Sequence, residues 1–585
     1  MGYYPVPRTG SAGASMDDLV IRGGEVLDGT GAPPVRADVA IRDGRIVAVA
    51  ADRAGAARRT LDARGLVVAP GFIDIKTHSD FTLPYATGAE SKVFQGVTTE
   101  VIGHCGLSVA PALPGRARLL QDYLAGFAPW IEVAETSFAR YMDRFPPTAV
   151  NVIMQVGHNT LRAMTVGLDD RAPTAAEQDA MRRLLDEGLA AGAIGLSSGL
   201  FTAPGSFARP EELHDLLAVV RRHRGTYATH VRDEADGVFD AVREAIAAAE
   251  ASGVHVQIVH LKLSGVDNWG RAGALLAEIE EARARGVPVD CDAYPYTFAA
   301  NPLRNLLPLW VQEGGLAAML GRLGVPATRA RIAGEIEARG LTSFGRVPAW
   351  DAISLSTSRT RSRDAGRSLG ELARAAGVAP IDLVHELLAA DGGATFVAVA
   401  SIDEADVRAL LRSPAVLVGS DGRSVARDSV AGQGKPHPRF YGTFPRVLGH
   451  YARDLGLLSL PDAVFKMTGG PARVLGLADR GLLREGYRAD VAVFDPATIL
   501  DRSTFEEPHQ YAAGLAATIV NGVVVVEGGA HTGARPVLAH AGWRTDPDTA
   551  ASTVLLASTE ASRTPVPVQE ARRVAREARA LALSS

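Results

Sequence analysis

The sequence predicts an α/β protein: a TIM-like (β/α)8 barrel joined to a small β-sandwich domain that is formed from both chain ends. Three observations lead to this fold class. In the middle of the chain, short apolar runs alternate with stretches rich in Ala, Leu, Glu and Arg, which is the pattern of a parallel βα array. Short β-branched runs separated by turn pairs occur near both ends. A long interval precedes the last apolar run, which predicts an insertion before the last barrel strand.

Each chain end contains a predicted hairpin. Asp43-Gly44 lies between two alternating segments near the N-terminus, and Asn521-Gly522 does so near the other end. Both dipeptides are typical of two-residue hairpin turns. Residues 1–16 are rich in Gly, Ser and Pro, which favours a disordered extension rather than a part of either hairpin.

From these patterns we expect the following domain organisation. Residues 17–70 and 470–540 form one composite β-sandwich domain, and residues 71–469 form the barrel. An insertion of about residues 298–414 lies over the barrel mouth, a usual place for a substrate lid. Residues 541–585 lose the β pattern and are expected to form a polar linker and possible helix.

Eight strand-like runs are found in the barrel region, which is the number of strands in a TIM barrel. In chain order they are LVVAPGFIDIKTH, GVTTEVIGHCG, AVNVIMQVGH, GAIGLSSGLF, GTYATHVRDE, VHVQIVHLKLS, VPVDCDAYPY and AVLVGSDG.

Composition excludes several classes of protein. Lys and Arg number 61 against 66 Asp and Glu, a net charge of -5, so we expect no electrostatic binding of nucleic acid. Only two cysteines occur, too few for a disulfide framework and typical of a reducing compartment. No apolar run approaches the ~20 residues of a membrane span, and the N-terminus does not have the pattern of a secretory signal. We therefore expect a cytoplasmic protein without a membrane partner.

The residues that end the predicted strands indicate a metal site. The second run ends in Cys105, the fifth in His230, the sixth in His260 and the eighth in Asp421. Taken singly, the cysteine and histidines could be core residues and Asp421 a turn residue. Because the carboxyl ends of barrel strands meet at one face, the four together predict a site. A thiolate and two imidazoles suit Zn²⁺ with water in the fourth position, and the carboxylate can take that water's proton.

The chain also resembles a known family from about residue 17 to about residue 536. It is similar to the N-acyl-D-amino-acid deacylase (D-aminoacylase) branch of the amidohydrolase superfamily. The stretches that carry the resemblance are GFIDIKTHSD, GVTTEVIGHCG, VGHNTLR, GAIGLSSGLFTAPGSFA, YATHVRDEADG, VQIVHLK, DAYPYT, VGSDG, HPRFYGTFPRVLG, KMTGGPARVLGL and GLLREGYRADVAVFDP.

The resemblance implies roles for particular residues. The family's tight zinc site corresponds to Cys105, His230 and His260, and its catalytic aspartate to Asp421. Contacts to the substrate carboxylate correspond to Lys262, to a tyrosine of DAYPY that we assign to Tyr294 rather than Tyr296, and to Arg439. Such a set suits an N-acyl amino acid, since Arg439 can hold a carboxylate bidentately while the amide lies at the metal.

The sequence departs from the family pattern at three positions. The family commonly has His-x-His on the first strand, where this chain has Lys76 and His78; His104 stands where asparagine is usual and Asn159 where glycine is usual. An ammonium has no lone pair for a metal. We therefore expect one tight zinc, with His78 lining only a weak second position. Lys76 would face Asp421 or the developing oxyanion on the substrate-binding side, unless it turns away to a carboxylate such as Asp80.

These observations predict a zinc-dependent hydrolase of the N-acyl bond of N-acyl-D-amino acids or close relatives, in which metal-bound water attacks and Asp421 is the general base and acid. The D preference comes from the resemblance alone. Two alternatives remain. A cyclic-amide hydrolase of hydantoinase or dihydroorotase type usually carries a metal-bridging lysine on the fourth strand, and GAIGLSSGLF has none. The other is a non-catalytic small-molecule binding protein.

Overall fold

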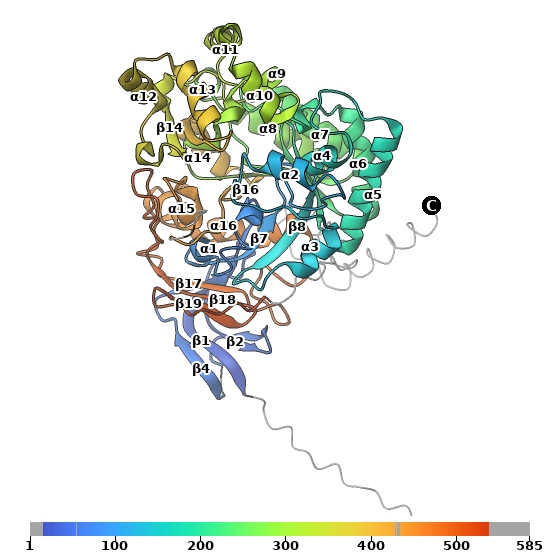
Figure 1. The fold of residues 1–585 in the computed structure, drawn as a ribbon. Helices are drawn as coiled ribbons and strands as arrows, with labels where there is room; N and C mark the ends of the chain where they lie inside the picture. The colour runs from blue at the N-terminus through green and yellow to red at the C-terminus, as the bar shows by residue number, and fades with distance from the viewer. Residues whose placement is uncertain (1–15, 54, 428, 430–432, 538–585) are drawn as a thin grey trace, which may run out of the picture.

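The computed structural model describes residues 16–53, 55–427, 429 and 433–537. The expectations for residues 1–15 and for the C-terminal segment from 541 onwards lie outside the described residues. The molecule has three parts along its length: a sheet built from both chain ends, a central barrel, and an insertion at the opposite end from the sheet (Figure 1).

The barrel contains eight parallel strands in the order β16-β12-β11-β10-β9-β8-β7-β6. Each of the eight predicted runs supplies one of them, so the predicted fold class is confirmed. The strands are β6 (Phe72–Asp74), β7 (Val97–Ile102), β8 (Asn151–Gly157), β9 (Gly195–Gly199), β10 (Thr226–His230), β11 (His255–Ile258), β12 (Val289–Ala293) and β16 (Val416–Val418).

The barrel closes between its first and last strands. Just beyond them, Thr77 and Gly422 form a parallel bridge. A buried ion pair supports this closure: the Lys92 ammonium donates to Asp74 Oδ2 and to Ser420 Oγ, both at 2.7 Å. The Ser420 amide in turn donates to Asp74 Oδ1 at 2.9 Å. The chain after β16 is therefore held tightly against the chain after β6.

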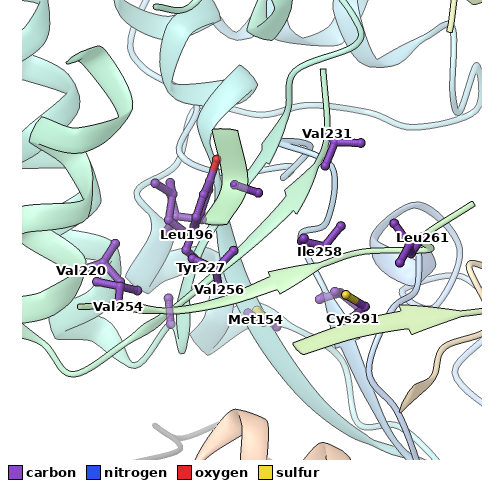
Figure 2. Close-up of a cluster of buried hydrophobic side chains, with 14 of the residues drawn as sticks. Met154, Leu196, Val220, Tyr227, Val231, Val254, Val256, Ile258, Leu261 and Cys291 are labelled. Carbon is purple, nitrogen blue, oxygen red and sulfur yellow. The ribbon is translucent and has the colours of Figure 1, made fainter. Parts of the chain in front are cut away.

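Helices cover the outside of the barrel and bury its apolar residues. Figure 2 shows part of this core, in which Leu196, Tyr227 and Val256 of neighbouring strands lie near Val220 of α6. A capping box formed by Thr174 and Glu177 begins α5. The covering helices are α4 (His158–Thr165), α5 (Ala175–Ala191), α6 (Pro210–Arg222), α7 (Val238–Ser252), α8 (Ala272–Ala284) and α14 (Glu404–Arg412). Further helices are α1 (Glu90–Val93), α2 (Ala117–Leu124), α3 (Phe138–Arg144), α15 (Arg439–Arg446), α16 (Leu460–Phe465) and α17 (Gly469–Leu475).

Both chain ends meet in one nine-stranded sheet. Strand β17 near the C-terminus pairs antiparallel with β5 near the N-terminus. Both predicted hairpins are confirmed, because Asp43-Gly44 and Asn521-Gly522 are the two-residue loops of β2–β3 and β18–β19 and have positive φ angles. The strands are β1 (Asp17–Val26), β2 (Val35–Arg42), β3 (Arg45–Ala50), β4 (Ala57–Asp62), β5 (Val67–Pro70), β17 (Val491–Phe494), β18 (Leu515–Val520), β19 (Val523–Glu527) and β20 (Ala530–His531).

The insertion between β12 and β16 has a hydrophobic core of its own. It contains a three-stranded antiparallel sheet of β13 (Phe298–Pro302), β14 (Ile353–Thr357) and β15 (Phe396–Ala400). Its helices are α9 (Leu309–Gln312), α10 (Gly315–Leu323), α11 (Pro326–Arg339), α12 (Leu369–Ala376) and α13 (Pro380–Ala390). The residue boundaries given above for the domains stay predictions. Among the described residues, every helix is too short or too polar to cross a membrane.

Candidate active site

A cavity of about 570 Å³ lies at the carboxyl ends of the barrel strands. Residues of β13 and β15 and of the segment after β14 also line it, so the insertion covers the barrel mouth. All but one of the predicted site residues line this cavity: His78, Cys105, His230, His260, Lys262, Tyr294, Asp421 and Arg439. The exception, Lys76, is fully buried beneath it.

Cys105, His230 and His260 form a buried group that we call the three-ligand cluster. The Cys105 sulfur lies 3.5 Å from His230 Nδ1 and 3.5 Å from His260 Nε2. Zinc bond lengths and a tetrahedral angle place a sulfur and a nitrogen ligand about 3.5 Å apart. The three donor atoms all lie within 4.8 Å of one another. Both the donor set and its spacing therefore fit a zinc ion.

The backbone is left-handed at three of the site residues. Cys105, His260 and Asp421 have φ angles of 55°, 37° and 50°. Eight non-glycine residues in the described part of the chain have positive φ, so three of these eight lie at one site. Residues held in this region cost free energy and collect at functional sites, where the surrounding structure imposes the conformation.

Burial sets the protonation of the cluster before any metal binds. Burial raises the pKa of the Cys105 thiol to about 12, although Lys76 opposes this shift. Burial and the Lys262 ammonium hold the pKa values of His230 and His260 well below their usual range. Both imidazoles are therefore neutral at pH 7 and have lone pairs to offer, while the thiol must lose its proton when a metal binds.

Glu234 supports the cluster from behind. Its Oε1 lies 3.2 Å from His230 Nε2 and 3.2 Å from His260 Nδ1, the ring nitrogens that face away from the cysteine sulfur. The same carboxylate forms an ion pair with Lys262. The two histidine distances are ion-pair distances rather than hydrogen bonds: His230 Nε2 has no hydrogen-bond partner among the described residues, and His260 Nδ1 lies 2.9 Å from the Lys262 ammonium.

Asp421 lies among cations beside the cluster. Lys76 forms a buried ion pair with it, and Arg439 Nη2 lies 2.8 Å from its Oδ2. Burial alone raises the pKa of Asp421, but Arg439 and Lys76 outweigh burial and hold the pKa well below its usual range. The Lys76 ammonium also lies 2.7 Å from His78 Nε2. Lys76 thus faces Asp421 rather than Asp80.

Lys262, Tyr294 and Arg439, which we call the cationic wall, lie together. The Tyr294 ring centroid is 5.6 Å from Lys262 Nζ and 4.8 Å from Arg439 Cζ. Tyr294 lines the cavity, whereas Tyr296 is not among the residues that line it. Two guanidinium nitrogens of Arg439, Nε and Nη1, are buried and have no hydrogen-bond partner among the described residues.

The sequence reasoning missed several residues of the site. Glu234 stands four residues after His230 within the stretch YATHVRDEADG, and this spacing could have identified it. Asp292 on β12 accepts a hydrogen bond from the His260 amide at 2.9 Å, and His437 Nδ1 accepts one from the Arg439 amide at 3.0 Å. The Asp292 contact has no local signal, because it joins residues 32 positions apart. His437 stands two residues before Arg439 in the stretch HPR, and this spacing could have identified it.

Comparisons with known proteins give a consistent result. The amidohydrolase family pattern matches residues 59–526. D-aminoacylase of Alcaligenes xylosoxydans xylosoxydans is 39% identical over 519 residues, which are 88% of this chain and 96% of the relative. N-acyl-D-glutamate deacylase of the same organism is 38% identical over 509 residues, which are 87% of this chain and 93% of the relative.

Solved structures agree with these relatives. A D-aminoacylase structure concerned with a binuclear metal centre, one-metal activation and second-metal attenuation has a TM-score of 0.75 and 37% identity, covering 90% of this chain and 99% of that chain. A second structure is that of N-acyl-D-glutamate deacylase of Bordetella bronchiseptica, complexed with zinc and a phosphonate mimic of the tetrahedral intermediate. It has a TM-score of 0.74 and 35% identity, and the match covers 91% of this chain and 100% of that chain. The chain therefore belongs to the amidohydrolase family, and to its D-aminoacylase branch.

Proposed function

We propose that this protein hydrolyses the N-acyl amide bond of N-acyl-D-amino acids with one zinc ion bound by the three-ligand cluster. The observation that carries the proposal is the position of this cluster beside Asp421 in a cavity that also contains the cationic wall. A metal centre, a base and a carboxylate-binding group are the parts that hydrolysis of an N-acyl amino acid needs.

The relatives support both the reaction class and the substrate. They are named for the deacylation of D-amino acid derivatives, and the chain is accordingly a hydrolase of carbon–nitrogen bonds other than peptide bonds. The preference for the D form is taken from these relatives. The zinc in the N-acyl-D-glutamate deacylase complex supports zinc as the metal here.

Each part of the site has a distinct task in this reaction. When bound, zinc supplies Lewis-acid polarisation of the acyl carbonyl and lowers the pKa of water. Asp421 accepts the proton of the attacking water and returns it to the leaving amine nitrogen. Glu234 lies 3.2 Å from the outer ring nitrogens of both histidines, where it would accept their N–H groups and orient the rings as ligands. The cationic wall binds the α-carboxylate of the substrate.

Substrate binding also changes the surroundings of Asp421. In the structure, Arg439 contacts Asp421 through Nη2, while Nε and Nη1 are free of partners among the residues that the structure describes. A substrate carboxylate on Arg439 partly neutralises the guanidinium, which raises the basicity of Asp421 when its function as a base is required.

A cyclic-amide hydrolase is the second candidate within the same fold. Such enzymes usually place a metal-bridging lysine on the fourth barrel strand, and β9 reads GLSSG. Lys76 also stands at the first position of the His-x-His pattern on the first barrel strand, so only His78 remains there as a ligand for a second metal. Both features favour the N-acyl substrate over a ring amide.

The substitution Asp421→Asn tests the proposal. Zinc-replete enzyme should release amine from N-acetyl-D-amino acids, and the variant should keep its zinc while losing about 10²-fold or more in turnover, because an amide cannot accept the proton. Asp391→Asn is a matched control, since Asp391 lines the same cavity but its carboxylate is bonded to Thr360 and Thr395.

Three outcomes would count against the assignment. Wild-type turnover by zinc-loaded Asp421→Asn would remove Asp421 as the base. Ring opening of hydantoins without amine release from N-acetyl-D-amino acids would favour the cyclic-amide reaction. Equal rates on N-acetyl-L-amino acids would remove the D preference.

A further inference from the structure

Arg423 is a buried cation of the cavity to which the proposed reaction assigns no task. It follows Asp421 by two residues, lines the same cavity and is only 8% exposed. Its guanidinium lies over three aromatic rings, with centroids at 5.9 Å for Phe81, 6.0 Å for Trp130 and 5.1 Å for Phe396. These rings belong to the segments after β6, before α3 and in the insertion, and none of them belongs to the cationic wall.

The other buried cations at this site each contact a carboxylate, with Lys76 and Arg439 sharing Asp421, but Arg423 does not. Lys262 is paired with Glu234, and both Lys76 and Arg439 with Asp421. The structure gives the Arg423 side chain no ion pair and no hydrogen bond with any residue that it describes. Asp421 and Asp80 act on it only through longer-range attraction, and its pKa is lowered to about 10 by burial and Arg439. The guanidinium therefore stays charged at neutral pH.

A buried guanidinium without a counter-ion is unfavourable, and aromatic rings do not accept its N–H groups as an oxygen does. The fork of donors fits a carboxylate bidentately. One α-carboxylate on the cationic wall leaves the positive charge of Arg423 uncompensated. The cavity is thus suited to a ligand with two negative groups.

We propose that Arg423 binds a second carboxylate of the substrate, so that the preferred substrates are N-acyl-D-amino acids with two acidic groups. This inference rests on the proposed function and deepens it. The second carboxylate can belong to the amino-acid side chain or to the acyl group, and both place the same chemistry on Arg423.

Two matched substrate pairs distinguish these sources. N-acetyl-D-glutamate against N-acetyl-D-glutamine tests the side chain, and N-succinyl-D-leucine against its terminal amide tests the acyl group. In one of the pairs, the acidic member should have a kcat/KM about tenfold or more above its neutral partner, the effect of one charge-assisted contact. That ratio should fall towards one in Arg423→Met and be partly kept in Arg423→Lys.

Arg359→Met is the control. Arg359 lines the rim of the same cavity but is exposed, and its Nη2 donates to the Ala390 carbonyl at 2.8 Å. Its loss removes the same charge from the cavity without removing a buried cation, so the acidic preference should remain. Zinc content and circular dichroism of each variant verify that the site and the fold are intact.

The outcomes separate this inference from the proposed function. Turnover of neutral N-acyl-D-amino acids with no acidic preference in either pair overturns the role of Arg423 alone. An equal loss for both members of a pair in Arg423→Met also overturns it, because a merely structural role would act on both. If zinc-replete enzyme turns over no N-acyl-D-amino acid of either kind, the proposed function fails and the inference fails with it.

Discussion

Lys76 is the residue that most distinguishes this site from a two-metal centre. Its ammonium is fully buried, pairs with Asp421 and lies 2.7 Å from His78 Nε2. Burial alone lowers the pKa of Lys76, but Asp421 and Cys105 outweigh burial and raise it above the usual value. The side chain is therefore charged, and it supplies positive charge near His78 without coordinating a metal.

Changing Lys76 should change the number of metals bound. We expect one zinc per chain in the wild type and in Lys76→Ala, because the three-ligand cluster does not include this residue. In Lys76→His, the new imidazole and His78 should raise the content towards two metals per chain. Elemental analysis after dialysis against buffered zinc measures this. Two zinc ions in the wild type would show that Lys76 does not exclude a second metal.

At the scale of the element, the motif GHNTLR on α4 shapes the barrel mouth. Asn159 exchanges two hydrogen bonds with the Gly199 backbone at the end of β9, both at 3.1 Å. A Cβ on Gly106, next to the ligand Cys105, would lie only 2.0 Å from Asn159 Oδ1. The asparagine and the glycine thus pack the ends of β7 and β9 against each other.

In the same helix, His158 and Arg162 both contact one carboxylate. Both are fully buried, and Glu212 of α6 accepts from His158 Nε2 at 2.7 Å and forms an ion pair with Arg162. We expect Glu212→Gln to lower the free energy of unfolding by about 3–5 kcal/mol, because it leaves a buried guanidinium without its counter-ion. Denaturant unfolding measures the change.

The neighbouring Glu211→Gln is the control for this prediction. Glu211 is exposed on the same helix, and such surface changes usually alter stability by less than about 0.5 kcal/mol. Equal effects of the two substitutions would show that the buried pair with Arg162 does not stabilise the packing of α4 on α6.

At the scale of the whole molecule, the metal ligands connect separate parts of the barrel. Cys105 follows β7, His230 ends β10 and His260 follows β11, so one bound ion joins the carboxyl ends of three barrel strands. The three ligands are far apart in sequence, so the complete metal site exists only in the folded chain. Metal binding is therefore expected to contribute directly to the stability of the fold.

Chelation should lower the thermal midpoint of the wild type. A ligand that binds only the folded state stabilises it by about 2.7 kcal/mol when its free concentration is ~100 times Kd, so removal of zinc should lower the Tm of a chain of this length by about 2 °C. The Tm of Cys105→Ala should respond to neither zinc nor chelator, whereas Cys291→Ala, which changes the other buried cysteine, should keep the response. An unchanged wild-type Tm after verified zinc removal would contradict the prediction.

The sequence by itself determined the fold class and most of the site, because both depend on short-range patterns. Each apolar run became a barrel strand, and the Asp-Gly and Asn-Gly pairs became hairpin turns, since hydrophobic periodicity and turn chemistry are local properties. Cys105, His230, His260 and Asp421 came together for a related reason: residues that end parallel barrel strands share one face.

Only the tertiary structure decided which charges face which partners. Lys262 is paired with Glu234 and Lys76 with Asp421, while the Arg423 side chain lies over aromatic rings and has no ion pair within the described chain. These relations depend on how loops from distant strands and the insertion fold over the cavity, and the free energy of a buried charge depends on every group that surrounds it. A strand pattern therefore predicts at which end of the barrel a side chain lies. The charge and pairing of that side chain are set by the three-dimensional arrangement of its neighbours.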